Sequence, residues 1–181
     1  CINGILTPRQ GYVAMNSQDI RKMPRLEVDK NMGYVPQNAK TEVCTPSVYE
    51  VTLMGRRPHV TWQISKKDEE ITWKAMEEMG VKHLADVPFD NLSSGQCQRV
   101  LIARALAQEA NVLLLDEPTS NLDVKYQIEV MDTIHKIVHG KNLSACMVIH
   151  DIDLAMRFCD KAVILSDGEV RAAGVIEDVV T

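Results

Sequence analysis

Two adjacent acids, Asp116 and Glu117, directly follow the continuous apolar run at residues 112–115. Such a run is typical of a strand in a parallel sheet that is covered on both faces, and open α/β sheets bind ligands at the carboxyl ends of their strands. Neighbouring carboxylates oppose each other's ionisation, so the pair is costly unless it is used. One acid can hold Mg²⁺ through oxygen ligands, and the other can orient or deprotonate a water molecule. The alternative is that these acids only cap the next helix.

A second group of residues stands at the start of a helix predicted over residues 93–109. Its opening residues are Ser93, Ser94, Gly95 and Gln96, at a place where unpaired backbone N–H groups and the helix dipole favour an anion. Ser93 adds a hydroxyl donor, and Gly95 allows close approach between the backbone and a phosphate. The alternative is an ordinary serine N-cap. A cap explains a serine here but not Gly95 and Gln96.

The hydrophobic pattern predicts an α/β fold with a parallel sheet to position these groups, because strand and helix patterns alternate from residue 111 onward. Strands are predicted at residues 10–15, 31–36, 112–115, 143–149 and 161–165, the last with a hairpin partner at 169–173. Helices are predicted at residues 66–79, 93–109, 124–139 and 152–159, and a further helix starts at 45–47, where Ser47 or Thr45 can be the cap. Gly80 and Gly140 are predicted to end the first and third of these helices. Residues 1–6 have the pattern of the last turns of a helix. Residues 45–92 show no strong strand and therefore indicate a helical insertion.

In order and spacing, these motifs resemble those of ABC-type ATPases over essentially the whole chain. Asp116-Glu117 is similar to the family's Walker B element, and residues 92–96 are similar to its signature Leu-Ser-Gly-Gly-Gln. The chain departs from the signature pattern at Ser94, where the family usually has Gly, and at Cys97, where it usually has a larger polar residue. Gln37 matches the family's Q-loop glutamine, and His150 matches its switch histidine. Residues 120–123 are similar to the family's D-loop.

The resemblance implies a P-loop NTPase-like (RecA-like) parallel sheet with a helical insertion subdomain at residues 38–90. Residues 1–181 would form one partial ABC ATPase domain. The resemblance also implies ATP and Mg²⁺ as ligands, and a dimer in which each signature faces the nucleotide that the opposite subunit holds. The nucleotide-facing residues would be Ser93, Ser94, Gly95, Gln96 and, in the D-loop, Asp123.

Further roles implied by the resemblance concern the sheet edge. Asp116 would hold the metal, mostly through water, and Glu117 would be the general base toward the attacking water. Gln37 would sense Mg²⁺ and the γ-phosphate, and His150 would contact the γ-phosphate. Phosphoryl transfer depends mainly on positioning and electrostatics, so a closed dimer that supplies further donors fits this chemistry.

The family's phosphate-binding loop, Gly-x-x-x-x-Gly-Lys-Ser/Thr, has no counterpart among the nine glycines of this chain. That loop holds the β- and γ-phosphates with backbone N–H groups and a lysine. Residues 1–8 resemble instead the stretch that follows the loop's helix. We therefore expect a chain that is truncated at both ends and that binds ATP very weakly by itself.

Residues 53–59, Leu-Met-Gly-Arg-Arg-Pro-His, are similar to ATPase subunits of importers for iron–siderophores, haem and cobalamin, as are residues 105–109 and 172–174. The resemblance implies three kinds of partner. They are a second ABC ATPase subunit, in a homodimer or a pair, membrane permease subunits, and a periplasmic or extracellular solute-binding protein that is an indirect partner. It implies a peripheral position on the cytoplasmic face of the cell membrane. A permease helix would dock in a groove formed by the loop after Gln37 and the helical insertion.

The composition agrees with a single globular domain: 45% of residues are hydrophobic and 25% are charged. The net charge of −5 argues against a nucleic-acid partner. Five cysteines without C-x-x-C spacing indicate free thiols in a reducing compartment. Two alternatives stay open, a non-transport ABC-type ATPase of DNA repair or translation and a non-catalytic fragment. The first is disfavoured because no heptads follow Gln37 and only one cassette is visible.

Other polar residues have ordinary explanations beside functional ones. His150 could be a satisfied structural histidine, but its place at the edge that carries the paired acids favours function. His135 and His139 have the i, i+4 spacing of a metal pair, yet no third ligand is near, so we expect a solvated helix face. Arg56 and Arg57 could bind a phosphate or a partner, although such a cluster is most often plain surface.

Overall fold

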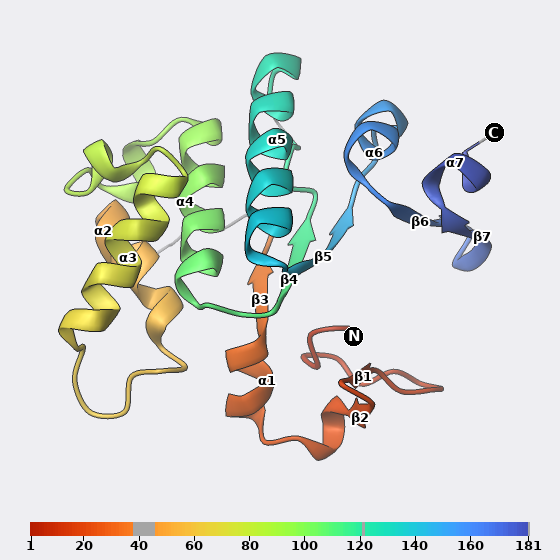
Figure 1. The fold of residues 1–181 in the computed structure, drawn as a ribbon, viewed down its shortest axis with the longest axis horizontal. Helices are drawn as coiled ribbons and strands as arrows, with labels where there is room; N and C mark the ends of the chain where they lie inside the picture. Colours follow the sequence, from red (N-terminus) through yellow and green to blue (C-terminus); the bar gives the residue numbers. More distant parts are fainter. Residues whose placement is uncertain (38–45, 121, 181) are drawn as a thin grey trace.

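Three parallel strands form the centre of the fold, in the order β3 (Met32–Val35), β4 (Val112–Asp116) and β5 (Ser144–Val148) (Figure 1). The structure is a computed structural model that describes residues 1–37, 46–120 and 122–180. The register pairs Val35 with Leu115 and Asp116 with Val148. All three strands therefore end at one edge of the sheet, as the sequence predicts.

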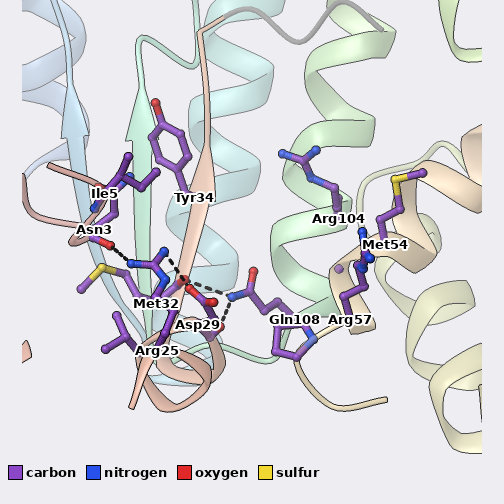
Figure 2. Close-up of a pocket in the computed structure, with 13 residues that line it drawn as sticks. Asn3, Ile5, Arg25, Asp29, Met32, Tyr34, Met54, Arg57, Arg104 and Gln108 are labelled. Carbon is purple, nitrogen blue, oxygen red and sulfur yellow. Dashed lines mark hydrogen bonds and ion pairs between the residues drawn. The ribbon is translucent and has the colours of Figure 1, made fainter. Parts of the chain in front are cut away.

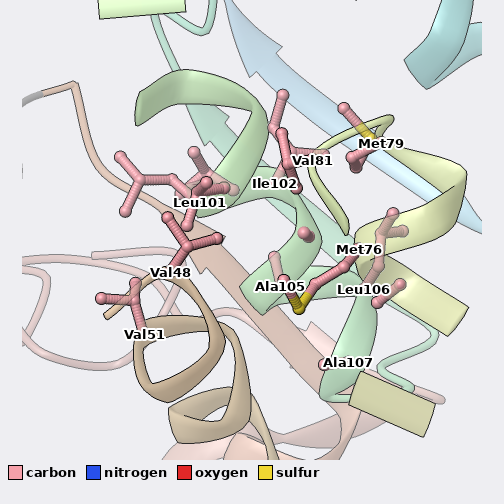
Figure 3. Packing of buried hydrophobic residues seen from close by; sticks show 14 of the residues in the cluster. Val48, Val51, Met76, Met79, Val81, Leu101, Ile102, Ala105, Leu106 and Ala107 are labelled. Atoms are coloured by element: carbon pink, nitrogen blue, oxygen red, sulfur yellow. The ribbon is translucent and has the colours of Figure 1, made fainter. Parts of the chain in front are cut away.

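Helix α4 (Ser94–Ala107) lies between the sheet and the helices of the insertion, and α5 (Val124–Lys141) covers the same face of the sheet. Most of α4 is buried, including Val100, Leu101 and Ile102. A helix that is buried on all sides does not need separate polar and apolar faces. This burial explains why the apolar residues of α4 are not confined to one face. Figure 3 shows its side chains packed against those of the insertion.

The described part of the insertion contains α2 (Val48–Leu53), α3 (Lys66–Glu78) and the short 3-10 helices η2 (Met54–Arg56), η3 (Lys82–Leu84) and η4 (Phe89–Asn91). The first two helices begin with capping boxes, one built on Ser47 and Glu50 and the other on Ser65 and Asp68. Thr45, the other expected cap, lies outside the described residues. Gly80, with φ +67°, follows the end of α3 as predicted.

Arg56 is not a surface residue, contrary to the sequence-based expectation, because it joins the insertion to α4. It is 3% exposed. Its Nε donates to Asp68 Oδ1 at 2.9 Å, and its Nη1 donates to the Ala107 carbonyl at 2.7 Å. The pKa of Asp68 falls to about 2, because Ser65 donates hydrogen bonds to its carboxylate and Arg56 adds another.

Gly55 brings η2 and α4 into backbone contact. A Cβ atom at this position would lie 2.0 Å from the carbonyl oxygen of Arg104. No side chain larger than hydrogen fits there unless one of the two elements moves. The insertion is therefore held against α4 by a backbone contact at Gly55 and by the buried Arg56 ion pair beside it.

The N-terminal segment differs most from the prediction. Residues 1–6 form turns instead of a helix, and the strand predicted at 10–15 is reduced to β1 (Ala14–Met15), paired with β2 (Gln18–Asp19). Then follow η1 (Ile20–Lys22) and an unpredicted helix, α1 (Arg25–Asn31). Gly4 has φ +72°, which favours a turn over a helix. This segment packs a small cluster, including Val28, on the second face of the sheet.

Strand β5 is covered on one face only within the described residues, although its apolar sequence predicts burial on both. Ala145 and Met147 pack against the main core, whereas Cys146 and Val148 are exposed. The cluster on the second face reaches Leu114 of β4 but not β5.

After β5 come α6 (Ile152–Phe158) and an antiparallel pair, β6 (Lys161–Ser166) and β7 (Glu169–Val175), followed by α7 (Ile176–Val179). The sequence predicts the hairpin correctly, but β6 does not extend the parallel sheet in the structure. Helix α5 runs through Gly140 and ends at Lys141, and its C-cap residue Asn142 adopts a left-handed conformation with φ 53°. The sequence-based end at Gly140 is therefore slightly early.

Candidate active site

Three predicted residues meet where the parallel strands end. Glu117 follows β4, Gln37 follows β3 by two residues, and His150 follows β5 by two. Gln37 Nε2 donates to Glu117 Oε2 at 2.5 Å, and His150 Nε2 lies 2.6 Å from Glu117 Oε1 and donates to it. The Glu117 side chain is 20% exposed and the His150 side chain 77%. The carboxylate is thus held between two donors at a sheet edge that is open to solvent.

The backbone of Glu117 is left-handed, with φ 48°, which is uncommon for a residue with a long side chain. Its N–H donates to the Val148 carbonyl at 3.2 Å, and its own carbonyl accepts from the Ser120 hydroxyl at 3.0 Å. Strained backbone of this kind gathers at functional sites, where the surrounding structure holds it in place. It turns the chain at the end of β4 and leaves the Glu117 side chain at the sheet edge.

Asp116 has a neighbour that the sequence-based reasoning did not assign to the site. The Tyr34 hydroxyl on β3 donates to Asp116 Oδ2 at 3.4 Å. Burial, with the adjacent Asp116 charge, raises the pKa of Tyr34, so that the phenol stays protonated as a donor. Tyr34 lies near the end of strand β3, three residues before Gln37. That position in the sequence is the signal that could have assigned Tyr34 to the site.

The sheet edge offers oxygen atoms of the kind that Mg²⁺ prefers. Asp116 provides a carboxylate. The Gln37 nitrogen bonds Glu117, and its amide oxygen accepts no hydrogen bond from the described residues, so it can face a ligand. Within residues 1–37, 46–120 and 122–180, no group of three or more His, Cys, Asp or Glu side chains could hold a metal ion. Mg²⁺ usually keeps several waters and shares phosphate oxygens with a substrate, and this sparse donor set fits that behaviour. The ion would neutralise charge on a transferring phosphoryl group.

The helix-opening motif lies in a separate pocket of about 490 Å³. Ser93 caps α4: its hydroxyl accepts from the Gln96 N–H at 3.4 Å, and its own N–H donates to Gln96 Oε1 at 3.0 Å. This capping box explains Gln96 as well as Ser93, which the sequence-based alternative did not foresee. The pocket is lined by Ser93, Ser94, Gly95 and Gln96, by Asp123, and by neighbours that include Arg99 and Tyr126.

Gly95 is the residue of this motif that the described structure leaves unexplained. A Cβ atom there would meet only Leu122 Cδ2 at 3.6 Å, an ordinary contact. Glycine inside a helix costs about 1 kcal/mol relative to alanine, so packing within the described residues does not favour it. Asp123, the N-cap of α5, makes no side-chain capping bond and faces the same pocket. Asn121, in the predicted D-loop, lies outside the described residues.

The predicted site residues thus fall into two groups. Gln37, Asp116, Glu117 and His150 lie at the sheet edge, whereas the signature residues and Asp123 line the other pocket. Among the described residues, no side-chain hydrogen bond joins one group to the other. The rings of His135 and His139 are in tilted contact, with centroids 4.3 Å apart and planes at 51°, and His135 also packs edge-on against Phe158. No described helix is both long enough and apolar enough to span a bilayer.

A parallel α/β sheet with these groups at its carboxyl edge, and an inserted helical unit that leads into a Ser-Ser-Gly-Gln helix, defines an ATP-binding cassette. A sequence profile described as ABC transporter matches residues 1–120. The chain belongs to the ABC transporter family, as an ATP-binding subunit, and the expected P-loop NTPase-like fold is confirmed.

Several curated relatives match nearly the whole chain. An uncharacterised ABC transporter ATP-binding protein of Methanocaldococcus jannaschii is 44% identical over 96% of the chain and 68% of its own length. The ferric enterobactin transport ATP-binding protein FepC of Escherichia coli is 36% identical over 99% of the chain and 67% of its own length. The cobalamin import ATP-binding protein BtuD of Halobacterium salinarum is 38% identical over 99% of the chain. The chain spans 45% of that third protein.

Solved structures show the same fold. A dimeric ATP-binding cassette in a post-hydrolysis state, bound to ADP and Pi, superposes with a TM-score of 0.81 at 25% identity. The match covers 97% of this chain and 77% of that one.

Proposed function

We propose that this chain forms part of the ATP-hydrolysing subunit that powers an importer of iron–siderophores, haem or cobalamin, and that these 181 residues are inactive alone. The single observation that carries the catalytic part is the Glu117 carboxylate, held between Gln37 and His150 where three parallel strands end. Relatives described as ferric enterobactin and cobalamin import proteins support the choice of solute class. The importer partners would be membrane permease subunits, and the site of action the cytoplasmic face of the membrane.

In the proposed mechanism, Glu117 accepts a proton from the water that attacks the γ-phosphate. A carboxylate that already accepts from two donors is fixed in position, and positioning is the main requirement of phosphoryl transfer. His150, exposed and hydrogen-bonded to Glu117, is placed to turn its Nε2–H toward a phosphate oxygen. Asp116, aligned by Tyr34, would hold Mg²⁺ together with Gln37.

We further propose that the signature pocket completes the site of a second ATPase subunit. Gly95 supports this, because nothing in the described chain requires a glycine there. Ser93 accepts a hydrogen bond as a cap, so its hydroxyl proton remains available for an external acceptor. The dimeric solved relative with ADP and Pi is consistent with this arrangement.

Substitution of Gly95 by Ala tests the signature role against a structural one. Alanine is expected to stabilise α4 by up to about 1 kcal/mol, yet to lower ATP hydrolysis at least about tenfold by keeping the phosphate from the backbone. The measurements are thermal melting and steady-state hydrolysis by the ATPase expressed from its whole gene. Gly140→Ala in α5, where a Cβ meets nothing within 4 Å, is the matched control and should leave hydrolysis unchanged. Full activity in Gly95→Ala would remove the signature role.

The 181 residues by themselves are expected to bind ATP–Mg²⁺ with a Kd above about 1 mM. They contain no Gly-Lys-Ser or Gly-Lys-Thr to hold the β- and γ-phosphates. Titration calorimetry on this purified stretch measures the affinity. Micromolar binding would show that other residues hold the nucleotide.

A further inference from the structure

The most exposed large hydrophobic side chain among the described residues is that of Trp62, which is 92% exposed. It lies in the segment that joins η2 to α3, and every residue from 61 to 67 is exposed. Ile64, two residues further on, is 51% exposed. Residues 61–67 therefore form an uncovered tip of the insertion, which we call the Trp62 tip.

The tip has a fixed base on both sides. Before it, His59 Nε2 lies 2.7 Å from the Gln108 carbonyl oxygen and donates to it. The Gln108 side chain in turn donates to the Met32 carbonyl at 3.0 Å, a hydrogen bond that is drawn as a dashed line in Figure 2. At the other end, Ser65 and Asp68 form the capping box of α3. Trp62 is thus presented to solvent from a base that is tied to the rest of the fold.

Three cations and no acid stand in the tip and just before it, although the whole chain carries a net charge of −5. They are Arg57, Lys66 and Lys67, all of which are exposed. None of them forms an ion pair with the part of the chain that the structure describes. Asp68, the first acid after them, is bound by Arg56. The tip therefore presents unpaired positive charge beside its exposed apolar side chains.

Helix stability does not explain the two lysines. Ser65 is the N-cap of α3, so that Lys66 and Lys67 are the first two residues of the helix. A positive charge in the first turn opposes the helix dipole, and an acid would suit these positions better. Within the described residues, Lys66 also forms no ion pair with Glu70, one turn further along α3. The position of the two lysines is therefore better explained by an anionic partner outside the chain.

The size and composition of the tip suit a bilayer better than a protein. A stable protein interface uses about 20–30 residues on each side, many more than the seven residues of the tip. A bilayer can receive a single indole, whose apolar ring enters the interface while its N–H stays hydrated. Anionic headgroups also attract lysine and arginine side chains that lie within about one Debye length of the surface.

We propose that the Trp62 tip binds directly to an anionic lipid surface. Trp62 and Ile64 would enter the interface between headgroups and acyl chains, and Arg57, Lys66 and Lys67 would be counter-charges to the headgroups. This contact goes beyond the importer function proposed above, which can hold without it. It would give the ATPase a second attachment to the membrane, separate from any contact with a permease.

Binding to vesicles, measured by sedimentation with the ATPase expressed from its whole gene, tests this proposal without a permease. Vesicles of phosphatidylcholine alone are compared with vesicles that contain about one-third phosphatidylglycerol. Wild type should bind the anionic vesicles at least about tenfold more tightly, because three cations approach the charged surface. This preference should disappear at about 1 M salt, where the Debye length falls to about 3 Å.

Two tip variants separate the apolar from the charged contribution. Trp62→Ala should weaken binding to anionic vesicles at least about tenfold, because the indole no longer leaves water. The double variant Lys66→Gln/Lys67→Gln should weaken it by a similar factor. Lipids with brominated acyl chains should quench tryptophan emission in wild type, and Trp62→Phe should remove this quenching. Without vesicles, ATP hydrolysis by each variant should stay within about twofold of wild type, since the replaced side chains are exposed.

Tyr12→Ala and Lys161→Gln are the matched controls and should bind vesicles like wild type. Tyr12 is 69% exposed on the N-terminal segment, and Lys161 is exposed on β6. Failure of wild type to bind anionic vesicles would overturn the proposal, as would binding that persists in both tip variants. Loss of binding in the lysine variant but not in Trp62→Ala would overturn the entry of Trp62 into the bilayer.

A protein partner at the tip would give a different result. Wild type would then ignore vesicles, and Trp62→Ala would weaken binding to the permease in detergent, which would also overturn the lipid contact. The importer function is tested separately, because it fails only if wild type does not bind a permease or does not hydrolyse ATP.

Discussion

Replacement of Glu117 by Gln is expected to lower ATP hydrolysis at least about 100-fold, the range of a lost general base, while ATP stays bound. An amide has nearly the shape of the carboxylate but cannot accept the proton of the attacking water. It also offers one acceptor oxygen where Glu117 accepts from both Gln37 and His150. One of these two contacts must therefore reverse its hydrogen-bond direction or be lost. Steady-state hydrolysis and nucleotide retention after gel filtration, on the ATPase expressed from its whole gene, measure the two effects.

A matched Glu→Gln change separates this effect from a general loss of charge. Glu169 lies on β7 and is exposed, so Glu169→Gln should hydrolyse ATP at the wild-type rate. If Glu117→Gln retained near-normal hydrolysis, Glu117 would not be the base. If it released ATP, the loss of activity would reflect binding and not chemistry.

The largest effect on stability is expected from Gly55→Ala. The new methyl group would stand 2.0 Å from the Arg104 carbonyl oxygen, and a backbone atom cannot turn aside as a side chain can. Separation of η2 from α4 should lower the free energy of unfolding by about 3 kcal/mol. For a protein of this size, that is a drop in Tm of roughly 6–12 °C. Chemical denaturation and thermal melting of the purified variant measure it.

Gly33→Ala gives a graded comparison. There the added carbon meets the Leu113 Cδ2 atom at 3.1 Å, the far end of a flexible side chain, and the cost should be smaller. Equal stability of Gly55→Ala and wild type would mean that η2 and α4 can move apart freely.

Where the sequence carries dense local signals, the structure agrees with the prediction. The capped helix start at Ser47, the helix stop at Gly80 and the apolar strand before Asp116 all depend on neighbouring residues, and all are confirmed. The cap at Ser93, which the sequence offered as the alternative to a phosphate contact, is also present. The meeting of Glu117 with its two partners could also be anticipated, because the ends of neighbouring parallel strands share an edge.

The unpredicted features depend on contacts between distant segments. The burial of Arg56 is decided by Asp68 and the Ala107 carbonyl, and nothing near Arg56 in sequence announces them. Tyr34 joins the site only because β3 lies beside β4. Exposure of one face of β5 follows from what packs on the sheet, which an apolar pattern alone does not reveal.

The left-handed backbone at Glu117 has a consequence for protein engineering. Glycine adopts this conformation freely, whereas a residue with a Cβ costs about 1–2 kcal/mol there. A library selected only for heat resistance should therefore enrich Gly at this position and discard the carboxylate. Thermal tolerance and turnover make opposite demands on one residue, so directed evolution of this ATPase needs a selection for hydrolysis alongside any selection for stability.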